Sequence, residues 1–377
     1  MPALSGIRVL DLSRVLAGPF CTSLLADIGA DVVKVEPPNG DDTRHLGPFV
    51  EGMSVYFAML NRDKRSIALD LKNDEDLRTL WSLVDRADVL VENFRPGVAD
   101  RLGVGAEAML ARNPGLIYTS ISGFGQTGEM SARPAYDLII QAMSGIMETT
   151  GRADGEPTKV GESIADLQAG LYGSWAICAA LVERGRTGRG QHLDIAMLDA
   201  MVSLQLTNAS LLAADGTPPT RVGNRHPVST PFGVYQAADA PVVLAAANDR
   251  TFQNLLALIG RPDLADHPTY RTDEARTAHE PEVRATIESW TRQHSAADVV
   301  ALAGQQGVPA GPVQDLQQAL DSVRHRGVTG HFQHPALDGM TALRQPVAFQ
   351  NTPHASPSTT PELDAHRAEV LHDWTIG

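Results

Sequence analysis

The sequence predicts an α/β protein, with a large doubly wound Rossmann-like domain and a smaller α/β domain. Strand-like and helical segments alternate through the first half of the chain. A stretch rich in Gly, Pro, Thr and Asn interrupts this alternation at residues 215–231. At 377 residues the chain is also longer than one small domain, because domains usually hold about 100–200 residues.

These observations predict three parts along the chain. We expect residues 1–214 to form the N-terminal part of the large domain and residues 215–330 to hold the linker and the small domain. Residues 331–377 are expected to return to the large domain. A tail rich in Pro, Ser and Thr at 351–361 leads to a last helix at 362–374.

The first segment predicts a βαβ unit. Residues 7–12 alternate like a strand, residues 17–28 have the apolar spacing of a helix, and residues 31–36 form a second strand-like run. Connections this short favour parallel pairing with a right-handed crossover. Further strands are expected at 65–70, 89–92, 116–121, 191–195 and 242–247. Further helices are expected at 74–85, 166–184, 198–213, 250–259, 282–292, 296–305 and 316–326.

The longest expected helix, 166–184, has a regular apolar spacing. One of its faces carries Leu167, Leu171, Trp175, Cys178 and Leu181. Gly185 and the glycine-rich turn after it end the helix.

Charge and cysteine content narrow the function. The 31 basic and 45 acidic side chains give a net charge of −14, so nucleic acid and anionic membranes are not expected partners. No apolar run approaches the roughly 18 residues of a membrane span, and no secretory signal is visible at the N-terminus. Cys21 and Cys178, expected to be buried, indicate a reduced, cytoplasmic protein without a disulfide framework. The histidines lack metal-ligand spacing, so no metal site is expected at His226, His325, His331 and His334.

A glycine-rich turn at residues 123–128 matches the G-x-G-x-x-G dinucleotide pattern after a strand. Pro134 interrupts any immediate helix, so a phosphate there would lack a helix N-terminus. We therefore favour a turn that lets the backbone approach a ligand or a neighbouring segment.

Asp166 lies at or just inside the start of the long helix. One interpretation is a helix N-cap, a common role of aspartate at such a position. The other is a nucleophilic carboxylate that forms a mixed anhydride with an acyl donor. The sequence pattern alone leaves both interpretations open.

Basic residues recur beside the ends of the expected strands, where open α/β sheets bind ligands. Each alone is typical of a solvated surface charge, but as a set they favour a polyphosphate ligand. The set comprises Arg14, Lys34, Arg44, Lys72, Arg95 and Arg101.

Several stretches together resemble the class III CoA-transferase family, also called CaiB/BaiF or formyl-CoA transferases. They run in family order over nearly the whole chain: VLDLSRVLAGPFCTSLLADIGADVVKVEPPNGDDTR, NRDKRSIALDLK, ADVLVENFRPGVADRLG, YTSISGFGQTG, RPAYDLIIQAMSG, GESIADLQAGLYG, GRGQHLDIAMLDA and RVGNRHPVSTPFGVYQAAD. The resemblance implies an enzyme that moves CoA from an acyl-CoA to a carboxylic acid, without a tightly bound cofactor. It also implies an interlocked homodimer.

The resemblance also implies roles for individual residues. The catalytic aspartate falls on Asp166, and substrate binding falls on Tyr136, Asp137 and Tyr56. Contacts to CoA fall on Val15, Leu16, Leu69, Lys72, Asn93, Phe94, Arg95 and Arg101.

Two alternatives stay open beside the transferase. Racemases of α-methylacyl-CoA share the fold but place a His before Asp where this chain has Tyr136, and a phenol is a poor base at neutral pH. A CoA-binding protein without catalysis is the second. Formyl-CoA transferases carry a tetraglycine flap that residues 224–230 lack, which disfavours formyl-CoA and oxalate as substrates. The donor and the acceptor are otherwise undetermined.

Overall fold

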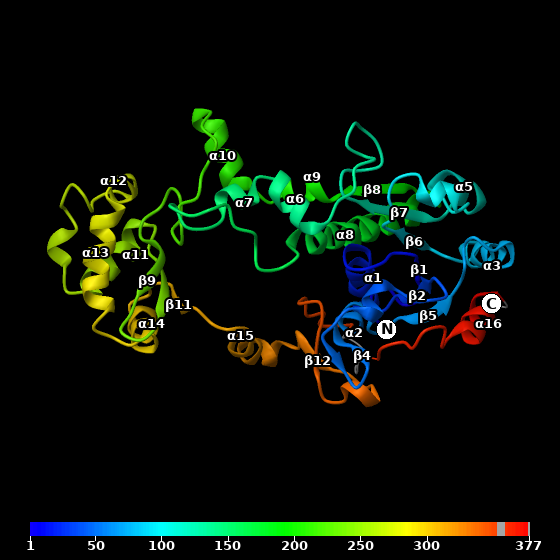
Figure 1. Ribbon diagram of the computed structural model, residues 1–377. Helices are drawn as coiled ribbons and strands as arrows, with labels where there is room; N and C mark the ends of the chain where they lie inside the picture. The colour runs from blue at the N-terminus through cyan, green and yellow to red at the C-terminus, as the bar shows by residue number, and fades with distance from the viewer. Residues whose placement is uncertain (353–358, 376–377) are drawn as a thin grey trace. The chain divides into compact units, whose positions relative to one another are not determined.

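The computed structural model describes residues 1–352 and 359–375. The chain forms two compact units (Figure 1). The large unit comprises residues 1–146, 159–216 and the chain from 323 onward, and the small unit comprises 147–158 and 217–322. The sequence predicted boundaries after 214 and 330.

Residues 147–158 correct the predicted division, because they were expected in the large domain. They pair instead with residues of the small unit. The Gly223 amide donates to the Gly151 carbonyl at 3.1 Å, and the guanidinium of Arg221 lies 2.9 Å from a carboxylate oxygen of Glu148. Through these contacts residues 147–158 belong to the small unit, although in sequence they lie between two segments of the large unit.

A six-stranded parallel sheet forms the centre of the large unit. Its strands, in spatial order, are β5 (Arg65–Ala68), β2 (Asp31–Glu36), β1 (Arg8–Asp11), β6 (Val89–Glu92), β7 (Ile117–Ser122) and β8 (His192–Ala196). The order reverses between β1 and β6, and open parallel sheets bind ligands at the carboxyl ends of the strands beside such a point.

Helices cover both faces of this sheet (Figure 1). One core cluster packs β1, β6 and β7 against α1 (Ala17–Asp27), α6 (Asp137–Met143), α8 (Ile164–Thr187) and α9 (Met197–Ser203). The other packs the opposite face against α3 (Asp74–Val84), α4 (Val98–Arg101), α5 (Ala106–Arg112) and α16 (Arg367–Thr375). Because both faces are covered, the strands from β5 to β7 are buried along nearly their whole length, whereas the edge strand β8 is buried only at Ile195.

Small residues of α8 pack against α1. A Cβ atom added to Gly170 would lie 2.6 Å from the carbonyl oxygen of Ala17, so only glycine allows this approach. Of the predicted apolar face, Cys178 and Leu181 pack against the core, whereas Leu171 and Trp175 remain 49% and 67% exposed. The apolar spacing located the helix but did not locate its buried side.

Several elements differ from the sequence prediction. The expected helix 198–213 is two helices, α9 and α10 (Leu206–Asp215), and between them the side-chain amide of Gln205 donates to the backbone carbonyl of Ser144. The last helix begins at Arg367 rather than 362, since Asp364 has a positive φ of 60°. Part of the predicted Pro/Ser/Thr tail, 353–358, lies outside the described residues. Cys178 is half-buried, whereas Cys21 is fully buried.

The sequence prediction omitted several short elements. Among them are β3 (Phe49–Val50), β4 (Met53–Ser54), α2 (Val55–Asn61), α7 (Ile146–Thr149), β12 (Thr329–His331) and β13 (Thr341–Leu343). The short helices α4, α5 and α6 of the large unit were not predicted either.

The small unit is built on an antiparallel sheet rather than on βαβ repeats. Its strands are β9 (Phe232–Gln236), β10 (Pro241–Ala245) and β11 (Ala310–Pro312). Its helices are α11 (Asp249–Leu258), α12 (Asp273–Ala278), α13 (Glu280–Thr291) and α14 (Ala296–Gln305), and α15 (Leu316–Val323) ends it. Strand β9 was missed because it begins directly after the predicted linker. Across 1–352 and 359–375, no helix is both long and apolar enough to span a membrane.

Candidate active site

A cavity of about 420 Å³ lies at the carboxyl ends of β1, β6 and β7 in the large unit. Seven of the predicted site residues line it: Val15, Leu16, Asn93, Phe94, Arg95, Tyr136 and Asp166. They come from the loops after β1, β6 and β7 and from the first turn of α8. The parallel sheet therefore brings together residues that are far apart in sequence.

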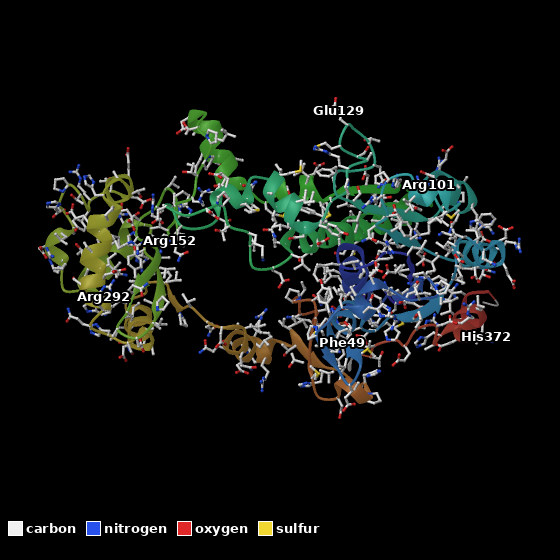
Figure 2. The ribbon with its side chains drawn as sticks, in the orientation of Figure 1. Phe49, Arg101, Glu129, Arg152, Arg292 and His372 are labelled. Atoms are coloured by element: carbon white, nitrogen blue, oxygen red, sulfur yellow. The ribbon has the colours of Figure 1, made fainter. Side chains whose placement is uncertain are left out.

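A second cavity of about 470 Å³ lies beside the first, at the ends of β2 and β5. Leu69 and Lys72 line it, and both cavities share Arg14, Phe94 and Val98. Arg101, exposed at the end of α4 (Figure 2), lines neither of these two cavities. Its predicted role in CoA binding therefore has no support from the cavity geometry.

Asp166 is the third residue of α8 and does not cap it. Ser163 occupies the cap position, so the interpretation of Asp166 as an N-cap is wrong. The carboxyl of Asp166 accepts no hydrogen bond from any residue in 1–352 or 359–375. Burial, followed by the nearby charge of Asp137, raises the pKa of Asp166 to about 7. The result is an unpaired carboxyl group at the cavity wall, poised near neutral pH.

Asp137 supports the start of α8 from the neighbouring helix. One carboxylate oxygen accepts the Ala165 amide at 2.8 Å, and the other accepts the Gln141 side-chain amide at 2.7 Å. Because both oxygens are engaged, Asp137 holds the turn that carries Asp166. It does not line either cavity, and its predicted contact with substrate stays a prediction.

Tyr56 lies on α2, within electrostatic reach of Asp166. Burial, followed by the charges of Asp166, Glu162 and Asp137, raises the pKa of the Tyr56 phenol to about 12. The phenol therefore stays protonated at neutral pH and is available as a hydrogen-bond donor. Tyr136, in contrast, is 75% exposed at the cavity wall.

The turn after β1 has an unusual backbone. Val15 has a φ of +66°, a conformation that β-branched residues rarely adopt. Asn93 pins the turn from the neighbouring loop, accepting the Arg14 amide at 2.8 Å and donating to the Arg14 carbonyl at 2.7 Å. The hydrogen bonds from Asn93 hold this strained turn in place, and Val15 and Leu16 line the cavity from it.

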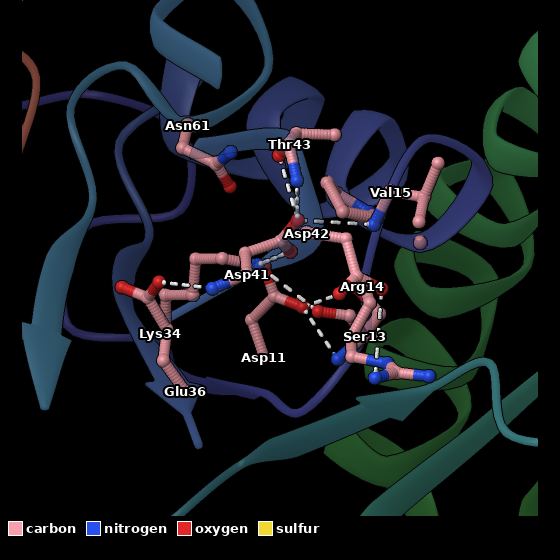
Figure 3. Close-up of polar contacts among 12 residues, drawn as sticks. Asp11, Ser13, Arg14, Val15, Lys34, Glu36, Asp41, Asp42, Thr43 and Asn61 are labelled. Carbon is pink, nitrogen blue, oxygen red and sulfur yellow. Dashed lines mark hydrogen bonds and ion pairs between the residues drawn. The ribbon is translucent and has the colours of Figure 1, made fainter. Parts of the chain in front are cut away.

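A fully buried ionic network lies beneath this turn (Figure 3). The ammonium group of Lys34 lies 2.8 Å from a carboxylate oxygen of Asp41 and donates to the Ser13 carbonyl at 3.0 Å. The Lys64 ammonium lies 2.9 Å from Asp11. Burial raises the pKa of Asp11, but Lys64, Lys34 and a hydrogen bond from Ser13 outweigh it and lower the pKa to about 2.

This network corrects the predicted set of anion-binding residues. Lys34 is committed to Asp41, and Arg44 donates to both carboxylate oxygens of Glu36 at 2.7 Å. Neither is free to bind a ligand. Both pairings join residues of different elements, so no local spacing signalled them.

The glycine-rich turn after β7 forms part of the cavity wall at Gly123. The Gln126 amide donates to Asp194 at 2.9 Å, and Gly125 has a φ of +83° that favours glycine. No helix begins until α6 at Asp137, so the turn lacks the helix N-terminus of a dinucleotide site.

The structure adds residues that the sequence analysis did not select. Ser131 and Arg133 line the first cavity from the loop that precedes Tyr136. Arg133 opens the R-P-A-Y-D stretch at 133–137, for which the family resemblance implied roles only at Tyr136 and Asp137, and Ser131 lies before that stretch. Within 1–352 and 359–375, no group of His, Cys, Asp and Glu is arranged to hold a metal ion.

The family profile described as "CoA-transferase family III" matches residues 4–367. The chain therefore belongs to CoA-transferase family III and is an enzyme of that class. A crystal structure of a CaiB/BaiF family protein from Brucella suis superposes with a TM-score of 0.87 and 39% identity, covering 99% of each chain. The resemblance seen in the sequence is confirmed.

Two relatives illustrate the reactions within this family. An acetyl-CoA:oxalate CoA-transferase of Acetobacter aceti is 46% identical over 84% of this chain and 82% of its own. A succinyl-CoA:mesaconate CoA-transferase of Haloarcula hispanica is 43% identical over 100% of this chain and 98% of its own. CoA thioesters are substrates of both.

Proposed function

We propose that this enzyme transfers CoA from an acyl-CoA donor to a small dicarboxylic acid through covalent intermediates on Asp166. The observation that carries the proposal is the unpaired carboxyl of Asp166 at the cavity wall, with a pKa near 7. The acids in the names of the relatives, oxalate and mesaconate, support a dicarboxylate acceptor. The absence of a tetraglycine flap disfavoured oxalate, but oxalate stands in the name of a relative that is 46% identical to this chain, so it stays among the proposed acceptors.

The first half-reaction releases the donor acid. The Asp166 carboxylate attacks the thioester carbonyl, the C–S bond breaks, and CoA leaves as a thiolate from an acyl-aspartyl anhydride. The thiolate then attacks the aspartyl carbonyl. The anhydride C–O bond breaks, the donor carboxylate departs, and an aspartyl-CoA thioester remains.

The second half-reaction reverses these steps with the acceptor. The acceptor carboxylate attacks the aspartyl thioester and expels the thiolate, which attacks the acceptor carbonyl of the new anhydride. A new acyl-CoA forms and the Asp166 carboxylate is regenerated. Each step exchanges one activated acyl bond for another, so the sequence balances without ATP, provided that water stays away from the intermediates.

CoA is proposed to extend across the two adjoining cavities. The second cavity, with Leu69 and Lys72, suits the adenosine and its phosphates, and Phe94 lies where both cavities meet. Arg95, exposed and without a side-chain partner among the described residues, suits a phosphate oxygen. The thiol end then reaches Asp166. Tyr136 and a protonated Tyr56 are proposed to contact the acyl group.

An interlocked homodimer in the cytoplasm is part of the proposal. Large apolar side chains are exposed on α6, α8 and α10, including Leu138, Trp175 and Leu206. Such a surface is typical of subunit contacts. The two free cysteines support a reducing compartment.

The test is a screen of acetyl-CoA, succinyl-CoA and formyl-CoA against oxalate, succinate, glutarate and mesaconate, with new thioesters detected by HPLC. We expect acceptor-dependent formation of a new acyl-CoA. A protein that binds CoA but forms no new thioester would contradict the proposal and favour the non-catalytic alternative. Exchange of the α-proton of a 2-methylacyl-CoA with deuterated water, without any acceptor, would favour the racemase.

A further inference from the structure

The first cavity contains three arginines whose surroundings differ. Arg14 lies 3.6 Å from Asp42, so a neighbouring carboxylate offsets part of its charge. The side chains of Arg95 and Arg133 are exposed and make no ion pair or hydrogen bond with residues 1–352 or 359–375. Two uncompensated cations in one cavity of a protein with a net charge of −14 indicate anionic groups on its ligand.

The three arginines lie on loops that differ in the cavities they border. Arg14 and Arg95 lie on the loops after β1 and β6, and both loops also border the second cavity through Arg14 and Phe94. Arg133 lies on the loop after β7, and no residue of that loop borders the second cavity. Arg133 instead shares its segment with Tyr136 and shares the first cavity with Asp166.

From this placement we infer that Arg133 binds the distal, unreacted carboxylate of a dicarboxylate substrate. The inference rests on the proposed function, which brings the thiol end of CoA to Asp166. The phosphates of CoA then lie toward the second cavity, so the anion at the Arg133 end belongs to the acyl group or the acceptor acid.

The chemistry of the two carboxylates supports this assignment. One carboxylate of the acceptor reacts at Asp166, while the other keeps its charge through every intermediate. The charges that affect this part of the site are acidic. The charge of Asp137 raises the pKa of Asp166, and the charges of Asp166, Glu162 and Asp137 raise the pKa of Tyr56. A second carboxylate would be repelled there unless a cation met it, and a guanidinium offers a planar, two-point match.

The test compares acids of equal carbon number with and without the second carboxylate. Wild type, Arg133→Met and Arg133→Lys are assayed with succinyl-CoA as donor and with glutarate against valerate and mesaconate against tiglate. In a double-displacement mechanism the kcat/KM for an acceptor reports only the steps after the donor acid has left. The ratio of kcat/KM for diacid to monoacid therefore isolates the distal carboxylate.

We expect Arg133→Met to lower this ratio by about 10- to 100-fold, as expected for the loss of hydrogen bonds to a charged group. The loss should fall mainly on KM, because the distal contact is the same before and during the reaction. Arg133→Lys should restore part of the ratio. The control Arg189→Met, an exposed arginine outside both cavities, should leave the ratio unchanged.

Other outcomes overturn the inference. An equal loss for diacids and monoacids in Arg133→Met would place Arg133 on CoA or on Asp166 itself. A ratio within threefold of the wild-type value would show that Arg133 does not recognise the substrate. A wild-type enzyme that prefers monoacids would show that its substrates are not dicarboxylates. In all of these the wild type transfers CoA, so the proposed transfer through Asp166 survives, although a preference for monoacids would remove the dicarboxylic acid from it as the acceptor. A wild type that forms no thioester from any acid contradicts both.

Discussion

Two aspartates in the large unit show how partners decide the behaviour of a buried carboxyl group. Asp11 is completely buried, yet two lysines and a serine hold its pKa at about 2. Asp166 is only half-buried, yet burial, followed by the charge of Asp137, raises its pKa to about 7, because no cation offsets them. Burial raises both pKa values, and the partners reverse the result in one case only.

The comparison separates a structural carboxylate from a reactive one. The charge of Asp11 is engaged by Lys64 and by hydrogen bonds from Ser13, in the turn after β1, and from Thr22 of α1. The charge of Asp166 has no protein partner among the described residues, so it can attack a substrate carbonyl. The two positions should therefore respond in opposite ways to the same substitution.

Asp166→Asn should give the largest effect. We expect CoA transfer to fall by about 10⁴-fold or more, because the nucleophile is lost. The free energy of unfolding at pH 8 should not decrease, since the raised pKa means that the charged carboxylate is disfavoured in the folded state. Steady-state kinetics and urea unfolding measure the two quantities. A variant of near wild-type activity would remove Asp166 from the mechanism.

Asp11→Asn should instead destabilise the large unit by about 3–5 kcal/mol at pH 7, because Lys64 and Lys34 would lose a buried counterion. Urea unfolding measures the loss. Asp85→Asn, which breaks the exposed pair with Arg112, is the control and should cost less than about 1 kcal/mol. Equal effects at the two positions would contradict the importance of the buried network.

The same contrast predicts opposite pH dependence of stability. The folded-state pKa of Asp11 is depressed, so its contribution is complete above pH 4 and is lost as the pH falls toward 2. The folded-state pKa of Asp166 is raised, so its contribution to stability declines as the pH rises from 4 to 7. Urea unfolding of wild type, Asp11→Asn and Asp166→Asn between pH 2 and 8 separates the two, and identical pH profiles would refute the assignment.

Asp137→Asn tests how much of the raised pKa of Asp166 comes from the charge of Asp137. In the wild type, kcat/KM for the acyl-CoA should rise with pH as the nucleophile loses its proton, with the midpoint of the rise near pH 7 and a plateau above it. The substituted amide side chain would keep an oxygen for the Ala165 amide but remove the neighbouring charge, which should move this limb to lower pH. If the rise of kcat/KM occurs at the same pH in Asp137→Asn as in the wild type, burial alone sets the pKa of Asp166.

Val15→Gly should give the smallest effect. Glycine adopts the φ of +66° without strain, so the free energy of unfolding should rise by up to about 1 kcal/mol. The KM for acyl-CoA should rise modestly, because a more flexible turn no longer fixes the cavity wall. Chemical denaturation and steady-state kinetics test this, and a loss of stability would contradict strain at Val15.

Local sequence patterns predicted most of the large unit. Short β-branched runs located the central strands, and the alternation with helices indicated parallel pairing. The buried side of α8 could not be predicted from apolar spacing, because it depends on Gly170 meeting the backbone of α1. Residues 147–158 were misassigned because their partners, such as Arg221, lie much later in the chain.

The candidate site was predicted unevenly for the same reason. Asp166 followed from its place at the start of a long helix and from the family resemblance. The commitment of Lys34 to Asp41 and of Arg44 to Glu36 could not be read from spacing, because burial and pairing are set by the tertiary fold. Arg133 was overlooked because only the folded loop brings it into the cavity with Asp166.

The most direct test of the central claim is mass spectrometry of the enzyme quenched during turnover with acyl-CoA. Our account predicts a CoA adduct on the peptide that contains Asp166, its conversion to a hydroxamate by hydroxylamine, and its absence in Asp166→Asn. An unmodified Asp166 peptide from an enzyme that is actively transferring CoA would contradict the account.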